Sequence, residues 1–499
     1  MQLQFEKKSY ECLRLLSCEH QYEELTQEVR LPDSMPDIGK VLCGWGQALL
    51  RGKEWRGSYA SASGGAMVWI LYLPEDGSEP RSVETWIPFQ MKWEVPDSKR
   101  DGLFQVSCHI QAVDGRSLSA RKLMVRVGVC GSAQIMEPAQ MELYQPSELP
   151  DDIQLLQNDY PLCIPKEAGE KMFALEEEIT VPASCPHADK LIRYSLQPEI
   201  IDCKVIGDKV VFRGCGILHM LLRCEDGRLH SCDVDVPFSQ YAQLEGEFSP
   251  DAQAKLQCAV TGMEADLTEE GTVRLKAGLT GQYVVYDKTV IPLIQDAYSV
   301  SREVTPVFGK LDMPLVLDDL RENHRAQWTM DGKLGEQADV HFFMDKPEQR
   351  WNGDRVAIEQ NGSFQILYYD EEGTLQIDSG KTENQWDLAL DPQGRVFVHV
   401  IPSGKPQLSI SPGSGMLAAE FVTQAVCLGD HGIRMVQELE IGEAGEKPEH
   451  TPSLILCRLG EKSLWQLAKE CKTTMEAIRH ANGLEGEPDS KRLLLIPYL

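Results

Sequence analysis

The sequence predicts a mainly β protein: tandem β-sandwich or barrel-like domains, followed by a small terminal domain with the order strand, helix, helix, strand. Three observations carry this prediction. Sequence landmarks recur at nearly constant spacing through the first 450 residues, which indicates an internal repeat. Long amphipathic helical patterns are scarce before residue 460. Within the last 47 residues, apolar side chains instead adopt helical spacing.

The first two copies of the repeat are related by an offset of about 150 residues. A Pro-rich box, an Asp-Gly turn and a Val/Ile-Pro-Phe box recur in the same order in both copies. Asp-Gly tolerates the positive φ of a tight hairpin turn, so the middle landmark predicts a β-hairpin. We expect both copies to share one strand order. The matching segments are 29–36 with 179–186, 75–77 with 225–227, and 87–89 with 236–238.

A third, degenerate copy follows the second at an offset of 146 residues. Residues 353–356 (GDRV) match 207–210 (GDKV), and 371–375 then meet 225–229 without a gap. Around each hairpin, polar and apolar residues alternate with period two, which is typical of strands. Turns recurring at about ten residues predict short strands.

Composition shifts predict the domain boundaries. The segment 137–167 is rich in Pro and Asp, and 442–452 is rich in Gly and Glu, so both are interpreted as linkers. The predicted organisation is an N-terminal arm (1–20), a first β-domain (21–140), a linker (141–171), a second β-domain (172–300), a degenerate third β-domain (301–441), a linker (442–452) and a terminal domain (453–499).

The formal net charge of −28 belongs almost entirely to the first 452 residues, because 453–499 hold seven Lys/Arg and six Asp/Glu. Such a surface repels phosphate backbones and anionic lipid, so we expect no nucleic-acid partner and no direct membrane insertion. The fifteen Cys form no Cys-x-x-Cys pair, and no signal-peptide pattern is visible at the start. A cytoplasmic protein with reduced thiols is expected.

The terminal domain carries its own helix signals. Ser463 with Gln466 forms a capping box, and Thr473 with Glu476 forms a second one. Apolar residues then follow at helical spacing, between two short apolar strands. The predicted core is Leu464, Trp465, Leu467, Ala468, Ile478 and Ile496.

This terminal segment resembles a LysM domain, through Gly460 to Trp465, Thr473-Thr474, 482–484 and 494–497. The resemblance implies binding of glycans that contain N-acetylglucosamine, in a groove between two loops. Lys491 and Arg492 stand where the family has a Gly-Gln turn, and that change favours an acidic protein partner over a sugar. The binding candidates are Gly460, Glu461, Lys462, Asn482, Gly483, Leu484, Lys491 and Arg492.

The repeated boxes resemble the SPOCS domain of sporulation proteins. SPOCS-like units followed by a LysM domain are similar to spore coat morphogenesis proteins of the SipL family. The resemblance implies a non-enzymatic scaffold on the mother-cell side of the forespore surface. It also implies that the LysM domain tethers the coat basement layer, which a coat morphogenetic ATPase assembles.

Other functional readings are weaker. His219, Cys224, His230 and Cys232 surround the second hairpin, but their spacing fits no common zinc pattern, so no metal ligand is assigned. No Walker, Rossmann or nucleophile-elbow motif occurs, and we expect no cofactor and no catalytic residue. A cell-wall module that binds peptidoglycan is the alternative function, and a hydrolase with an unrecognised site is a third.

Overall fold

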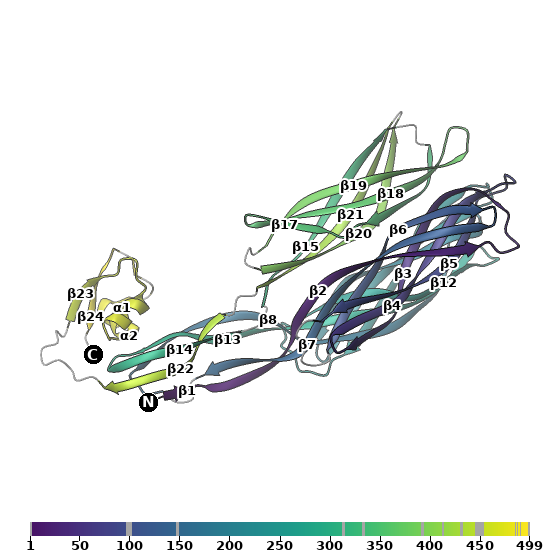
Figure 1. The fold of residues 1–499 in the computed structure, drawn as a ribbon. Helices are drawn as coiled ribbons and strands as arrows, with labels where there is room; N and C mark the ends of the chain where they lie inside the picture. The colour runs from purple at the N-terminus through teal and green to yellow at the C-terminus, as the bar shows by residue number, and fades with distance from the viewer. Residues whose placement is uncertain are drawn as a thin grey trace.

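The computed structural model describes residues 2–95, 102–145, 149–311, 315–331, 335–390, 394–411, 414–429, 433–444, 454–484, 486, 488–489 and 491–497. The chain is mainly β, as the sequence predicts. Figure 1 shows a body of packed sheets, a stalk of paired strands and a small module at the end of the stalk. Across these ranges, no helix has the length and apolar character needed to cross a membrane.

Unit 1 consists of two open antiparallel sheets with the orders β2-β7-β6 and β3-β4-β5. In β5, Val83, Ile87, Phe89 and Trp93 are buried at alternate positions, so the strand presents one apolar face to the facing sheet. The strands are β2 (Glu6–Arg30), β3 (Ile38–Arg56), β4 (Tyr59–Pro74), β5 (Arg81–Glu94), β6 (Leu103–Ser119) and β7 (Lys122–Gln145).

Unit 2 has the same strand order, β8-β13-β12 and β9-β10-β11, as the repeat predicts. Both ends of β9 lie 150 residues beyond those of β3, and the same offset relates β10 to β4. The strands are β8 (Ile153–Thr180), β9 (Ala188–Ile206), β10 (Lys209–Cys224), β11 (Leu229–Gln243), β12 (Gln253–Leu267) and β13 (Thr272–Ser299).

Unit 3 keeps the pattern with interruptions. Its sheets are β15-β21-β20 and one in which β18 pairs with β16, β17 and β19. The strands are β14 (Arg302–Leu311), β15 (Leu315–Asp331), β16 (Glu336–Met344), β17 (Glu348–Asn352), β18 (Arg355–Tyr369), β19 (Leu375–Ala389), β20 (Gly394–Ser411), β21 (Ser414–Gly429) and β22 (Ile433–Ala444).

Left-handed glycines mark corresponding turns in all three units. A positive φ is unfavourable for residues with a Cβ, so each of these turns selects glycine. These glycines form two sets of three, and within each set the successive offsets are 150 and 146 residues. Gly57, the first glycine of one set, is not part of any repeated box described above. The φ angles are 58°, 61° and 68° at Gly57, Gly207 and Gly353, and 74°, 75° and 79° at Gly77, Gly227 and Gly373.

The strands are longer than the sequence pattern predicts, and the sheets of the described ranges are open rather than barrel-like. Residues 141–145 and 153–171, interpreted above as linker, lie in β7 and β8. The predicted N-terminal arm lies in β1 (Gln2–Gln4) and in β2. The linker assigned to 442–452 begins in β22, and its residues from 445 onward lie outside the described ranges.

The extra strand length builds the stalk, defined here as the ribbons β2–β7, β8–β13 and β14–β22 beyond the sheets of the body. β1 adds to the third ribbon through β22. The apolar cluster between the ribbons is Cys12, Met141, Leu143, Ile164, Ile291, Leu293, Leu311 and Met435.

Prolines in the stalk explain why its sequence resembles a linker. Pro138 lies in β7 beyond the reach of β6, and Pro292 lies in β13 beyond the reach of β12. On that side neither strand has a ladder partner among the pairs described for it, and a proline that faces a free edge costs no sheet hydrogen bond. Pro and Asp here mark ribbon edges rather than a flexible segment.

Candidate functional site

The terminal module has the element order strand, helix, helix, strand. β23 (Leu454–Arg458) pairs antiparallel with β24 (Leu493–Pro497), and α1 (Leu464–Glu470) and α2 (Met475–Asn482) lie between them in the chain. The predicted capping box is confirmed: Ser463 accepts from the Gln466 backbone N–H, and the Gln466 side chain accepts from the Ser463 N–H. The predicted core residues Leu464, Trp465, Leu467, Ala468, Ile478 and Ile496 are all buried.

The second predicted capping box is wrong by one residue. The cap of α2 is Thr474, whose hydroxyl accepts from the Ala477 N–H at 3.0 Å. Thr473 is completely buried, and its backbone N–H is donated to Ala468. The chain therefore enters α2 one residue later than the spacing of Thr473 and Glu476 predicts.

The structure brings the two candidate binding loops together. Asn482 donates to the Leu495 carbonyl at 2.6 Å and accepts the Leu495 N–H at 2.7 Å, so it ties the end of α2 to β24. Arg492 donates to the Asn482 carbonyl at 3.2 Å, and its own carbonyl accepts the Leu459 N–H at 3.5 Å, beside Gly460. Gly460, Glu461, Lys462, Gly483, Lys491 and Arg492 are exposed, and Asn482 and Leu484 are partly exposed.

Three of these candidates have local structural roles. Gly483 has a φ of 57° and caps α2 in the left-handed conformation, which favours glycine. Lys462 pairs with Glu470 at 2.5 Å, and this pair raises the pKa of the Lys462 ammonium. Gly460, with a φ of 63°, turns the chain from β23 toward α1. Lys491 and Arg492 are the exposed cations at the turn before β24, and Arg492 also holds the end of α2 through the Asn482 carbonyl.

The module docks on the tip of the stalk through α1. Asp296 of β13 accepts from the Trp465 indole at 2.8 Å and from the Lys469 ammonium at 2.7 Å. Tyr298 packs edge-on against Trp465 at 4.7 Å and donates its hydroxyl to the Thr473 carbonyl at 2.7 Å. Trp465 is consequently only 6% exposed, so it is not placed to stack on a sugar.

Asp296 is the electrostatic centre of this contact. Burial raises its pKa, but the hydrogen bonds from Lys469 and Trp465 outweigh burial and hold the pKa below its usual value. Sequence reasoning missed both Asp296 and Tyr298. The signal available was a carboxylate within the apolar strand 291–298, which a buried partner would explain.

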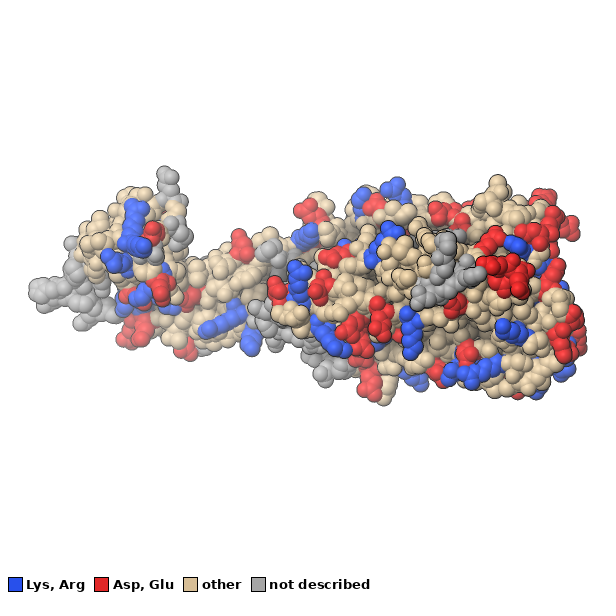
Figure 2. Space-filling view, turned by 90° about the horizontal axis from the view of Figure 1, so that it is seen from above, with Lys and Arg blue, Asp and Glu red and all other residues tan. Residues whose placement is uncertain are grey.

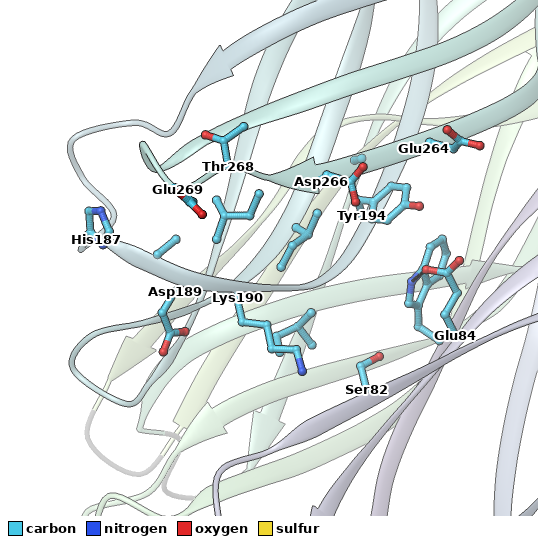
Figure 3. A pocket seen from close by; sticks show the side chains of 16 residues that line it. Ser82, Glu84, His187, Asp189, Lys190, Tyr194, Glu264, Asp266, Thr268 and Glu269 are labelled. Atoms are coloured by element: carbon cyan, nitrogen blue, oxygen red, sulfur yellow. Dashed lines mark hydrogen bonds between the residues drawn. The ribbon is translucent and has the colours of Figure 1, made fainter. Parts of the chain in front are cut away.

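The body holds an open pocket of about 740 Å³ between units 1 and 2. Figure 3 shows Glu84 of β5 and Tyr194 of β9 on its wall, with Glu264 and Asp266 of β12. Burial raises the pKa of the Glu84 carboxyl, although the Trp69 indole donates to it at 3.1 Å. The pocket is acidic and lined by strand and loop residues of two units.

A buried ionic network joins the three units. Arg193 of β9 donates to Asp339 of β16 at 2.7 Å, and His219 of β10 contacts the same carboxylate at 3.0 Å. The guanidinium lies 4.5 Å from the ring centre of Trp45 in β3. His219 also bonds Asp233, so this histidine, considered above as a metal ligand, is held by carboxylates of β11 and β16.

The other three residues around the second hairpin, Cys224, His230 and Cys232, have different structural roles. His230 pairs with Asp226 at 2.8 Å in the hairpin turn, and Cys224 and Cys232 are buried. Within the described ranges, no cluster of three or more His, Cys, Asp or Glu side chains has metal-binding geometry. These residues serve the hairpin and the junction between units.

Comparison with known proteins gives one family match. Residues 187–268 match the family model described as SipL, SPOCS domain. The match lies within unit 2, from β9 to the end of β12, and its two ends line the pocket of Figure 3. No curated protein and no solved structure matches the chain significantly. The match supports the resemblance to the SipL family and indicates a role related to the sporulation coat.

Proposed function

We propose that the chain is a non-enzymatic adaptor of endospore coat assembly. The family match at residues 187–268 supports the connection with the coat. The observation that carries the adaptor role is the arrangement of body, stalk and module: the ribbons of all three units converge on one tip, where α1 docks. Such an arrangement presents a small binding module at the end of a rigid support.

The proposed site of action is the mother-cell side of the forespore surface, in the cytoplasm. There the module, as a LysM-like domain, tethers the coat basement layer, and the proposed partner is the coat morphogenetic ATPase that assembles this layer. Supporting this choice, Lys491 and Arg492 are exposed beside the candidate binding loops, and cations of this kind suit an acidic protein surface. The family resemblance supplies the identity of the partner.

Charge reversal at the groove edge tests the proposal. With purified full-length chain and the coat ATPase of the same organism, we expect Arg492→Glu to weaken binding about tenfold. Because Arg492 is exposed, its attraction is screened, and raising the salt concentration should weaken the wild type as well. Biolayer interferometry measures both effects. Lys472→Glu is the matched control and should bind like the wild type: Lys472 is exposed and precedes Thr473, whose carbonyl bonds to Tyr298 of the stalk.

Glycan binding is the competing outcome of the same experiment. Titration with chito-oligosaccharides should give weak binding at best. Tight binding of these sugars that is insensitive to salt and to Arg492→Glu contradicts the proposal, and identifies the module as a reader of peptidoglycan.

A further inference from the structure

The sheet of the module is apolar on both faces. One face packs on the helices through Ile455, Leu494 and Ile496. The other face carries four exposed leucines, called the leucine face here. Leu456 and Leu495 are cross-strand partners on it, so the apolar surface is continuous across both strands. The exposed fractions are 54% for Leu454, 60% for Leu456, 52% for Leu493 and 42% for Leu495.

The leucine face points away from the stalk. The helices cover the opposite face of the sheet, and α1 is the element that docks on Asp296 at the stalk tip. Figure 1 shows β23 and the module at the end of the molecule opposite to the body. The leucine face is therefore placed to meet a surface end-on, without interference from the three units.

Cations flank the leucine face. Arg458 lies on it by strand alternation with Leu454 and Leu456, and it is cross-strand partner to Leu493. Lys491 and Arg492 are exposed at the turn that leads into β24. A soluble module gains nothing from four exposed leucines, and basic residues beside such a patch are typical of surfaces that bind anionic lipid.

The acidic charge of the chain lies elsewhere. Residues 453–499 are near neutral, so the net charge of −28 belongs to the body and stalk. β14 alone, with ten residues, spans about 30 Å of stalk, roughly four Debye lengths at physiological ionic strength. Figure 2 shows Lys and Arg side chains over the module and many Asp and Glu side chains at the far end of the body.

We propose that the leucine face docks the chain on an anionic lipid bilayer. The leucines enter the interfacial layer, while Arg458 and its neighbours meet the lipid phosphates. The total charge of the chain predicts repulsion from lipid, but screening confines that repulsion to the body and the stalk. The end-on position and the mixture of apolar and cationic groups favour a bilayer over a protein partner. The inference goes beyond the proposed function, since it assigns a lipid ligand to the four leucines and Arg458, which the protein-binding proposal does not use.

Vesicle sedimentation of the full-length chain tests the proposal. The wild type should bind vesicles of phosphatidylglycerol and phosphatidylcholine, and bind pure phosphatidylcholine much more weakly. Leu456→Thr with Leu495→Thr should lower partitioning at least about tenfold, because both leucines lose their apolar burial. Arg458→Glu should remove most of the preference for the anionic vesicles.

The control is a matched pair of apolar substitutions on the body, Met172→Thr with Ile201→Thr, at side chains that are 78% and 73% exposed. Circular dichroism checks that each variant keeps its strands; all four positions are exposed, so none leaves a core cavity. Failure of the wild type to bind anionic vesicles overturns the proposal. So does equal binding by the leucine variant and the control. If the leucine variant loses binding to the coat ATPase but still binds anionic vesicles, the leucine face binds protein and the lipid proposal is wrong.

Discussion

Asp339→Ala should destabilise the folded chain by about 3–5 kcal/mol, the largest effect expected of any single substitution proposed here. The substitution leaves the Arg193 guanidinium, which is 2% exposed, without its carboxylate. Burial raises the pKa of Asp339, but Arg193 and His219 outweigh it and hold the pKa below its usual value, so this carboxylate is charged at neutral pH. Urea unfolding followed by tryptophan fluorescence measures the loss, because Trp45 adjoins the guanidinium.

The control for this prediction is Asp202→Ala. Asp202 also pairs with cations, Lys204 and Arg213, but both lie at the surface, so we expect a change within about 1 kcal/mol. If Asp339→Ala does not fold, the double variant Arg193→Met with Asp339→Met should recover much of the stability, because it removes both buried charges. Equal stability of Asp339→Ala and Asp202→Ala contradicts the prediction.

Acid should loosen the contact between units 1 and 3 through three partly buried histidines. His20 lies in β2, His109 in β6 and His399 in β20; His109 lowers the pKa of His20, and both lower the pKa of His399. Burial is the main cause for all three: it lowers the pKa of His20 and His399 to about 4, and it also lowers that of His109. Groups facing the cluster include Ser132, which contacts His20 at 2.5 Å, and Lys346, Cys130 and Asp345.

Histidines titrate near pH 6.5 in the unfolded chain, so the folded state binds fewer protons than the unfolded state below that pH. Stability is therefore complete above about pH 7 and falls as the pH drops from 6.5 toward 4. For His399 the loss between pH 7.5 and 5.0 should be about 1–2 kcal/mol. His399→Gln should remove this part of the loss, and His187→Gln, at an exposed histidine, should not. Urea unfolding at pH 7.5 and pH 5.0 measures the free energy of unfolding at both values. An equal loss of this free energy in the wild type and in His399→Gln would contradict the role assigned to His399.

The sequence predicts the repeated parts of the fold well because turns and alternation are local. The turns at Gly77 and Gly227 require a positive φ, which glycine adopts readily, and Gly373 occupies the corresponding turn of the third unit. The stalk was missed for a physical reason: an isolated two-stranded ribbon has free edges that accept Pro and Asp, so its composition resembles that of a linker. Only the packing of three ribbons, separated by about 150 residues each, shows that these segments form one structure.

The site shows the same limit. The loop residues near Asn482 follow from motif spacing, but the module's contact with the stalk depends on Asp296, which lies 169 residues before Trp465. No local pattern links the two. The leucine face could be predicted from the sequence. Residues 493–496 are apolar at every position, whereas a strand with one solvated face should alternate between apolar and polar residues.

We propose a coat adaptor that acts through its terminal module, and the location of the chain in sporulating cells tests this role most directly. A fluorescent fusion of the full chain should form a ring around the forespore on the mother-cell side. The same fusion lacking residues 445–499 should spread through the mother-cell cytoplasm. A ring that persists without the module, or a full-length fusion that marks the vegetative cell wall, would contradict the account.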